Sequence, residues 1–166
     1  MRHKLKLRAL HLDKIDPPGS HQLPLTPTPI PDRQPTITGF YAYGAQDAAG
    51  RLEFQAGSYT KTYDNNRQDT LGQPLTETLD HSRTEFAGTL LVRVQPKTYA
   101  TLTARQYAYD YTENFNARDS KENYLFAGLR WDVSALTTGR IAFGYQTKKF
   151  EPTGSGAPAI EYKGGA

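Results

Sequence analysis

Few residues in this chain have the types and spacing that catalysis or metal binding requires. The histidines fall in segments expected to be tail or loop, without the spacing of metal ligands along a strand. They are His3, His11, His21 and His81. Asp80, His81 and Ser82 have the residue types of a catalytic triad, but sequence neighbours rarely adopt its geometry. Because cysteine is absent as well, we predict no enzyme, no metal site and no cofactor.

A set of charged residues shares one side of several alternating segments. It consists of Arg93, Arg105, Arg130, Asp132, Arg140 and Lys148, with Glu53 and Lys61 on an earlier hairpin. Basic residues outnumber acidic ones in this set, so a lumen lined by it would favour anionic solutes or an acidic polysaccharide. The structural alternative is a hairpin that turns near residue 136, in which Asp132 and Arg140 lie opposite each other as a cross-strand pair.

The elements that carry these residues alternate between apolar and polar positions, as β-strands with two different faces do. We place strands at 36–45, 51–62, 84–94, 99–111, 123–133 and 139–150. Segments of about ten residues match tilted strands that cross a bilayer, and alternating short and long connections are typical of outer-membrane barrels. The sequence therefore predicts an all-β, antiparallel up-and-down meander of about six long strands that forms part of an outer-membrane β-barrel.

The opposite parity of the last two strands is apolar, and we expect it to face lipid. Its residues are Leu125, Leu129, Trp131, Val133, Ile141, Phe143 and Tyr145. The alternative is a soluble β-sandwich or small barrel, in which a second protein layer covers this stripe and a tyrosine-rich surface binds carbohydrate. The chain contains 11 tyrosines, which fit either a membrane-interface girdle or an ordinary sheet.

The segment 99–111 is the hardest to fit to a membrane. Its apolar parity, through Leu102 and Ala104, continues to Asp110, where a charge facing lipid would cost about 2–4 kcal/mol. A β-bulge at Arg105 or Gln106 would avoid that cost, and we predict one there. Such a bulge would shift the register by one residue and turn the three tyrosines that follow outward, where they would form an aromatic girdle. They are Tyr107, Tyr109 and Tyr111.

The two ends of the chain read as poor folding units. Residues 1–35 start with basic residues and then hold seven of the 11 prolines, which predicts a disordered tail before the meander of 36–150. Residues 151–166 are rich in Gly and Pro and are expected to be a loop or tail. No export signal is visible. If the first strand leads into a short periplasmic turn, the tail lies outside the cell, which suggests a fragment of a longer barrel.

A series of motifs between residues 83 and 150 resembles a known family. An Arg118-Asp119-Ser120 loop, a Gly128-x-x-Trp131 strand, a Thr137-Thr138 turn and a Gly144-Tyr145 strand follow in this order. They resemble a hairpin of the outer-membrane β-barrel proteins associated with exopolysaccharide and exosortase gene clusters. The resemblance implies a porin-like barrel of a Gram-negative outer membrane that helps to assemble or export a surface polysaccharide, and it implies no catalytic residues.

Partners follow from the same observations. The expected partners are outer-membrane lipid, a polysaccharide or anionic solute, and other envelope export components. The net charge of +3 is mild and comes without a basic patch or a recognisable nucleic-acid module, so we expect no nucleic-acid binding.

Overall fold

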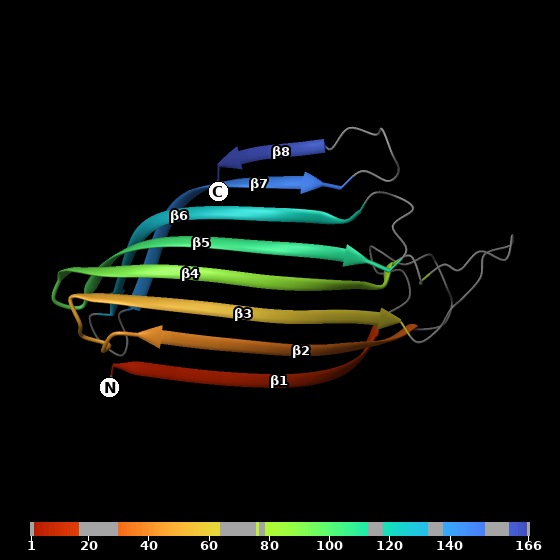
Figure 1. The fold of residues 1–166 in the computed structure, drawn as a ribbon, viewed down its shortest axis with the longest axis horizontal. Helices are drawn as coiled ribbons and strands as arrows, with labels where there is room; N and C mark the ends of the chain where they lie inside the picture. The colour runs from red at the N-terminus through yellow and green to blue at the C-terminus, as the bar shows by residue number, and fades with distance from the viewer. Residues whose placement is uncertain are drawn as a thin grey trace, which may run out of the picture.

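The fold is a single antiparallel sheet in which each strand pairs with its neighbours in sequence. The computed structural model describes residues 2–16, 30–63, 76, 79–112, 118–132, 138–151 and 160–165. Its strands are β1 (His3–Asp16), β2 (Ile30–Tyr43), β3 (Gly50–Tyr63), β4 (His81–Gln95), β5 (Thr98–Tyr111), β6 (Ser120–Asp132), β7 (Thr138–Phe150) and β8 (Ile160–Gly165). The order in the sheet is β1-β2-β3-β4-β5-β6-β7-β8, with antiparallel pairing throughout (Figure 1). The predicted all-β meander is confirmed.

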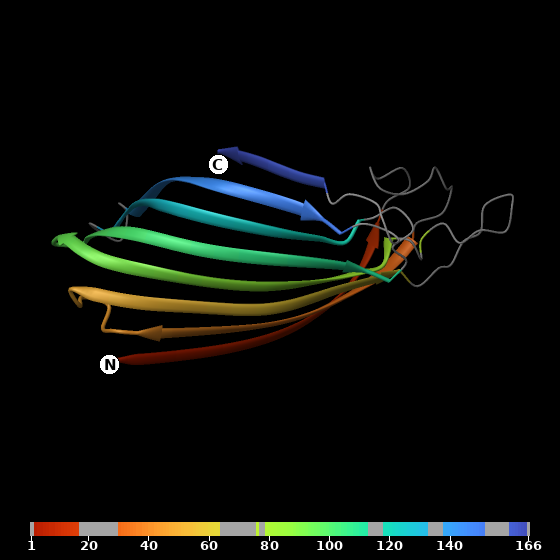
Figure 2. The ribbon, with the colours of Figure 1, turned by 45° about the horizontal axis from the view of Figure 1, so that its top comes forward.

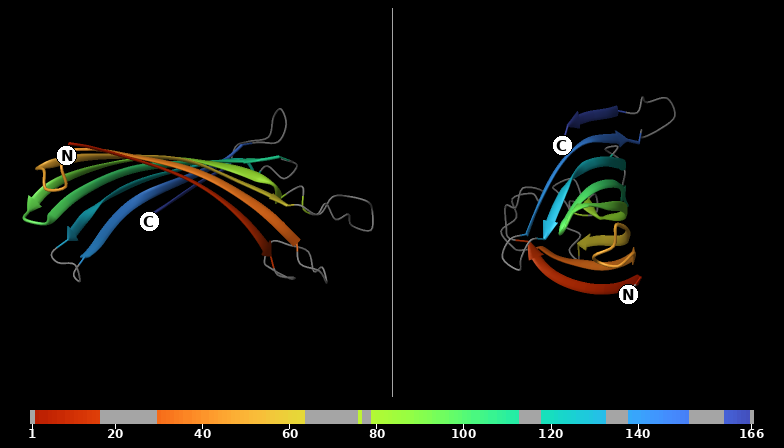
Figure 3. Two further views of the ribbon diagram at one scale, coloured as in Figure 1. Left: turned by 90° about the horizontal axis from the view of Figure 1, so that it is seen from below. Right: turned by 90° about the vertical axis from the view of Figure 1, so that its left-hand side faces the viewer.

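The sheet is open, curved and twisted. Among the described strands β1 and β8 form its two edges and do not pair with each other (Figure 2). The strands arch along their length and rotate relative to one another, as Figure 3 shows in two perpendicular views. Long antiparallel strands twist in this way because of backbone sterics, and the same twist lets such sheets close into barrels. None of the described residues forms a helix long and apolar enough to cross a membrane.

The prediction of a disordered tail over 1–35 is wrong for the described part of that segment. His3 to Asp16 form β1, and β2 begins at Ile30 instead of residue 36. The two strands pair over their whole length, from His3 opposite Tyr43 to Asp16 opposite Ile30. In the first half of β1, Lys4, Lys6 and Arg8 alternate with Leu5 and Leu7, which makes one side basic and the other apolar there. Beyond Ala9 the pattern changes, because Leu10 and Leu12 lie on the same side as the basic residues.

Prolines do not prevent β2 from pairing. Pro31 and Pro35 lie opposite Ile15 and His11 of β1, whereas the ladder between β2 and β3 skips Gln34 and Pro35. Proline has no amide proton to donate, so an interrupted ladder is where a strand tolerates it. The proline-rich residues 17–29 lie outside the described residues.

The strand count and the phase of the meander also need correction. The described chain has eight strands instead of about six, because β1 and the short β8 are added at the edges. β8 lies in the segment 151–166, which was predicted to be loop or tail. β1 starts at the same end as the β2–β3 and β4–β5 turns (Figure 1). The first strand therefore does not lead into a short turn, as was expected. The order of short and long connections thus gives no support to the prediction of a fragment.

The predicted bulge at Arg105 or Gln106 is also wrong. The ladders of β5 with β4 and β6 continue through both residues without a shift in register. The shift lies between Arg93 and Gln95, beside the tight β4–β5 turn, where Lys97 has a φ of 64°. A bulge next to a short turn adjusts the local twist of a hairpin. The parity of β5 is therefore constant, and its tyrosines do not turn outward.

Candidate functional site

The two faces of the sheet differ in both chemistry and exposure. We call the face that carries Leu125 and Phe143 the outer face, and the face that carries Arg105 and Glu122 the inner face. Many outer-face side chains are large and apolar yet exposed, with exposed fractions of 72% for Phe143, 59% for Phe86 and 53% for Leu125. The residues with the least exposure include polar ones, such as Ser120 at 2%. This is the reverse of a water-soluble protein, in which large exposed apolar surfaces are rare.

Every described residue of the set predicted to face lipid lies on the outer face. Leu129 pairs with Ile141, Leu125 pairs with Tyr145, and Ala127 pairs with Phe143. Trp131 follows on the same face, where its indole lies against Gly139. Val133 lies outside the described residues. No second layer covers this face in the part of the chain that the structure describes, so the soluble sandwich has no support from the geometry.

The apolar part of the outer face runs obliquely across the strands. The paired row that starts at Ile37 of β2 passes through Ser58 and reaches Lys121 of β6. The row that starts at Tyr41 of β2 reaches Leu125 of β6 instead. Strands tilted by roughly 35–45° carry a level apolar band across successive rows in this way. The stagger is thus the one that a barrel wall needs.

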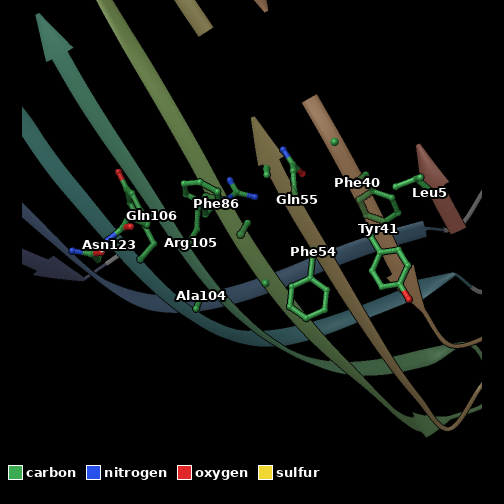
Figure 4. Close-up of a pocket in the computed structure, with 15 residues that line it drawn as sticks. Leu5, Phe40, Tyr41, Phe54, Gln55, Phe86, Ala104, Arg105, Gln106 and Asn123 are labelled. Atoms are coloured by element: carbon green, nitrogen blue, oxygen red, sulfur yellow. Dashed lines mark hydrogen bonds between the residues drawn. The ribbon is translucent and has the colours of Figure 1, made fainter. Parts of the chain in front are cut away.

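A groove of about 680 Å³ crosses this outer face (Figure 4). Its lining includes the small residues Gly39, Ala56, Gly88 and Ala104 and the larger Leu5, Tyr41, Phe54 and Phe86. At one end Gln106 donates a hydrogen bond to Asn123 at 2.9 Å. The unbroken parity of β5 thus leaves Gln106 and Asp110 on the outer face, toward the end of the sheet that lies away from the short turns. The expected cost of these polar side chains is limited if the apolar band ends there.

The charged residues predicted to line a lumen all lie on the inner face. They are Arg93, Arg105, Arg130, Asp132, Arg140 and Lys148. Their pairing differs from the predicted one, because Arg140 lies opposite Arg130 and Asp132 lies opposite Thr138. The hairpin turns one residue earlier than expected, which moves each partner by two positions and keeps the faces unchanged. Arg130 instead forms an ion pair with Asp132 on its own strand, at 3.3 Å.

A hollow of about 480 Å³ on the inner face brings several of these residues together. Threonines from β4 and β5 form part of its lining, and Thr89 and Thr103 are hydrogen-bonded at 3.0 Å. Its charged lining consists of Arg105, Arg130, Arg140, Glu53 and Asp132. Arginines thus outnumber carboxylates. Hydroxyl groups beside a net positive charge are suited to hydrogen-bond and attract a hydrated anion.

A second inner-face cluster consists of tyrosines interleaved with charged residues, and we call it the tyrosine cluster. It contains Tyr59, Tyr107, Tyr109, Tyr124, Arg83, Glu85, Glu122 and Lys148, together with Arg105 at its border with the hollow. Lys148 contacts Glu122 at 2.7 Å, and the Tyr124 hydroxyl donates to the other Glu122 oxygen at 2.9 Å. Arg105 lies 3.6 Å from Glu85 and donates to the Tyr107 hydroxyl at 3.2 Å.

This cluster was not predicted from the sequence, because the bulge expected at Arg105 or Gln106 would turn the tyrosines of β5 outward. Without the bulge, Tyr107 and Tyr109 keep the parity of Arg105 and face inward. Arg83 and Tyr59 share that face, and a strict two-residue alternation through Arg83, Glu85 and Leu91 is the signal that could have identified them. Among the described residues, no group of three or more His, Cys, Asp or Glu side chains is close enough to hold a metal ion.

The comparison with protein families identifies one family. A family model described as "Putative beta-barrel porin 2" matches residues 7–153. No curated protein and no solved structure matches the chain. The matched segment begins within β1 and ends just after β7, so it covers both faces of nearly the whole sheet.

Proposed function

The chain belongs to this β-barrel porin family, and on that basis we propose that its inner face lines a passage through which an exopolysaccharide crosses the outer membrane. Family membership itself gives the coarser statement, which is a porin-like β-barrel located in the outer membrane. The passage, its cargo and its lining are the proposal. The observation that carries it is the contrast between the two faces of the sheet. Apolar side chains are exposed on the outer face, and charged side chains pair with one another on the inner face.

Lipid is the partner that the outer face suits. Its exposed side chains include Leu102, Leu129 and Phe143, which would cost free energy in water at about 25 cal/mol per Å² of apolar surface. In a bilayer that cost disappears, while the ladders between neighbouring strands satisfy the backbone donors and acceptors of the paired residues, which lipid cannot do. We therefore assign Leu125, Leu129, Trp131, Ile141, Phe143 and Tyr145 to the lipid-facing wall.

An anionic cargo is favoured by the inner face. Arg140 is exposed and lies directly opposite Arg130, and Asp132, which pairs with Arg130 at 3.3 Å, is one carboxylate beside two arginines. This group therefore keeps a net positive charge, which an anion would stabilise. The threonine floor of the hollow offers hydroxyl groups to a hydrated polymer. The resemblance of residues 83–150 to polysaccharide-associated barrels points to the same cargo, and it suggests that other export components of a Gram-negative envelope act with this protein.

Ion selectivity in a planar bilayer tests the passage. The full chain is folded into detergent, inserted into the bilayer, and its reversal potential is measured in a KCl gradient. We expect a preference for chloride over potassium that falls in the double variant Arg130→Ala with Arg140→Ala, because wall charge sets selectivity. An acidic polysaccharide added to one side should reduce the current more than a neutral polymer of equal length.

The chain offers a matched control for this experiment. Lys121 and Lys149 are also a directly opposed basic pair on β6 and β7, but they lie on the outer face. The double variant Lys121→Ala with Lys149→Ala removes the same charge and should leave the chloride preference unchanged. Absence of any conductance, or an equal change in the two double variants, would contradict the proposal.

A further inference from the structure

We propose that Arg83 and the tyrosines around it form a subsite for a carboxylate-bearing sugar, a uronate, on the inner face. The inference rests on the proposed function, since it names the chemical class of the polymer that the passage carries. The charges of the tyrosine cluster are unbalanced: within the part of the chain that the structure describes, the cation Arg83 has aromatic neighbours but no carboxylate partner.

The other charges of the cluster are neutralised. Glu85 faces Arg105 and accepts a hydrogen bond from Gln55 at 3.2 Å. Glu122 contacts Lys148 at 2.7 Å. Arg83 forms no ion pair within the described part of the chain, and its buried Nε has no hydrogen-bond acceptor. Arg51 and Arg105 also have a buried Nε without a hydrogen bond, but each of these faces a glutamate, at 2.8 Å and 3.6 Å.

Two tyrosine rings flank the Arg83 guanidinium. Its carbon lies 5.3 Å from the ring centroid of Tyr59 and 5.3 Å from that of Tyr107. Cation–π contacts at this distance orient the planar guanidinium but use none of its N–H donors. Buried or partly buried cations are normally paired, since an uncompensated charge is costly. The site is therefore organised for an anion that none of the described residues supplies.

A carboxylate is the anion that fits, because guanidinium binds it through two parallel hydrogen bonds. The surrounding rings favour a carboxylate attached to a sugar. Tyr107 and Tyr124 meet edge to face with centroids 5.9 Å apart, and Tyr107 and Tyr109 are 6.4 Å apart. The apolar C–H face of a pyranose can pack on such rings, while its hydroxyl groups reach Glu122 and Lys148. A small inorganic anion would leave these rings uncovered.

Calorimetric titration of the folded full chain in detergent tests the subsite. The probes are trigalacturonate, neutral maltotriose, and the pair galacturonate and acetate. We expect trigalacturonate to bind more tightly than maltotriose, and galacturonate more tightly than acetate. Arg83→Gln should weaken trigalacturonate binding by about tenfold or more, as expected from loss of charge-assisted hydrogen bonds. Maltotriose binding should change little.

Two further variants keep the test decisive. Arg83→Lys retains the charge but loses the planar fork, so it should recover only part of the affinity. Lys149→Gln removes one positive charge from the outer face and should bind like the unmodified chain. Equal affinity for trigalacturonate and maltotriose, or unchanged affinity in Arg83→Gln, would overturn the subsite, and acetate binding as tightly as galacturonate would overturn its sugar specificity.

The two proposals fail in different ways. A bilayer channel with the expected chloride preference, combined with no trigalacturonate binding, would overturn the subsite alone. Arg83-dependent binding in a chain that never conducts would support the subsite and overturn the passage.

Discussion

The two faces of β6 differ in the exposure of their charged side chains and in the kind of side chain that they carry. Lys121 and Glu122 are neighbours in sequence, and each makes a 2.7 Å contact with an oppositely charged side chain. The Lys121–Glu151 pair on the outer face is exposed on both sides, whereas Glu122 on the inner face is only 13% exposed. Further along the strand, Leu125 and Leu129 point outward and Tyr124 and Arg130 point inward. One strand thus presents two surfaces adapted to two solvents.

The two faces also differ in the contacts that contribute to the free energy of folding. In a soluble sheet the apolar face is stabilised by a second protein layer, so its side chains are buried. Here the apolar side chains remain exposed and the polar ones are crowded together, so the stabilising contacts of the protein lie on the charged face. The apolar face depends on contacts with lipid for its contribution to stability. Substitutions on the two faces should therefore have different consequences at matched positions.

The largest expected difference comes from a charge placed in the middle of each face of β5. Leu102 pairs with Leu90 and Ala127 at the centre of the outer apolar band. Leu102→Arg should destabilise the protein folded in lipid vesicles by about 2–4 kcal/mol, the cost of a basic side chain near the bilayer midplane. Urea unfolding of the vesicle-bound protein, followed by tryptophan fluorescence, measures the change.

The adjacent inner-face position is the control. Thr101 lies on the floor of the inner hollow beside Glu53 and Asp132. Thr101→Arg adds the same side chain where water and carboxylates are available, so it should cost less than about 1 kcal/mol. An equal loss of unfolding free energy in the two variants would mean that the two faces meet the same solvent, and it would contradict the assignment of one face to lipid and the other to water.

The part of this contrast that can be predicted from the sequence is the alternation itself. In β6 and β7 the parity of Leu125, Leu129 and Ile141 is unbroken, so both faces and both strands could be predicted from local pattern alone. β1 alternates in this way only as far as Arg8, and its basic start and the prolines that follow favoured a tail. Local propensity was overridden there by pairing with β2, which is a contact between distant residues.

Register and bulges could not be predicted in the same way. A shift of two residues between β6 and β7 leaves both faces intact, so the face pattern cannot distinguish Asp132 opposite Arg140 from Arg130 opposite Arg140. The bulge near Arg93 depends on the geometry of the β4–β5 turn, and Lys97 gives no sequence signal for its positive φ. The position of Arg83 between Tyr59 and Tyr107 depends on two registers, that of β3 with β4 and that of β4 with β5.

Glycines sharpen the comparison at a smaller scale. On the inner face, a Cβ at Gly144 would collide with the backbone carbonyl of Leu125 and lie 2.5 Å from the Phe126 ring. Gly144→Ala should therefore force β6 and β7 apart and cost about 1–3 kcal/mol. On the outer face, a Cβ at Gly88 would lie 3.8 Å from the Phe54 ring, an ordinary contact at the floor of the groove.

Gly88→Ala should consequently be neutral or stabilise the fold by about 0.4–1 kcal/mol, since it reduces the entropy of the unfolded chain. The midpoints of urea unfolding in vesicles distinguish the two substitutions. If Gly88→Ala destabilised the protein as much as Gly144→Ala, the outer face at Gly88 would be packed as closely as the inner face at Gly144. That result would contradict the open space of the groove beside Gly88.

The smallest expected effect compares the two ion pairs that begin at Lys121 and Glu122. A double-mutant cycle with Glu122→Gln and Lys148→Met should give a coupling free energy of about 1–2 kcal/mol, because the pair is partly buried and Glu122 also accepts a hydrogen bond from Tyr124. The same cycle with Lys121→Met and Glu151→Gln should give no measurable coupling, since both side chains are more than half exposed. The N–O distances of the two pairs are equal, so any difference in coupling reports the environment of each face. Equal couplings would show that the crowding of the inner face does not strengthen its charge network, and the contrast between the faces would then be one of composition alone.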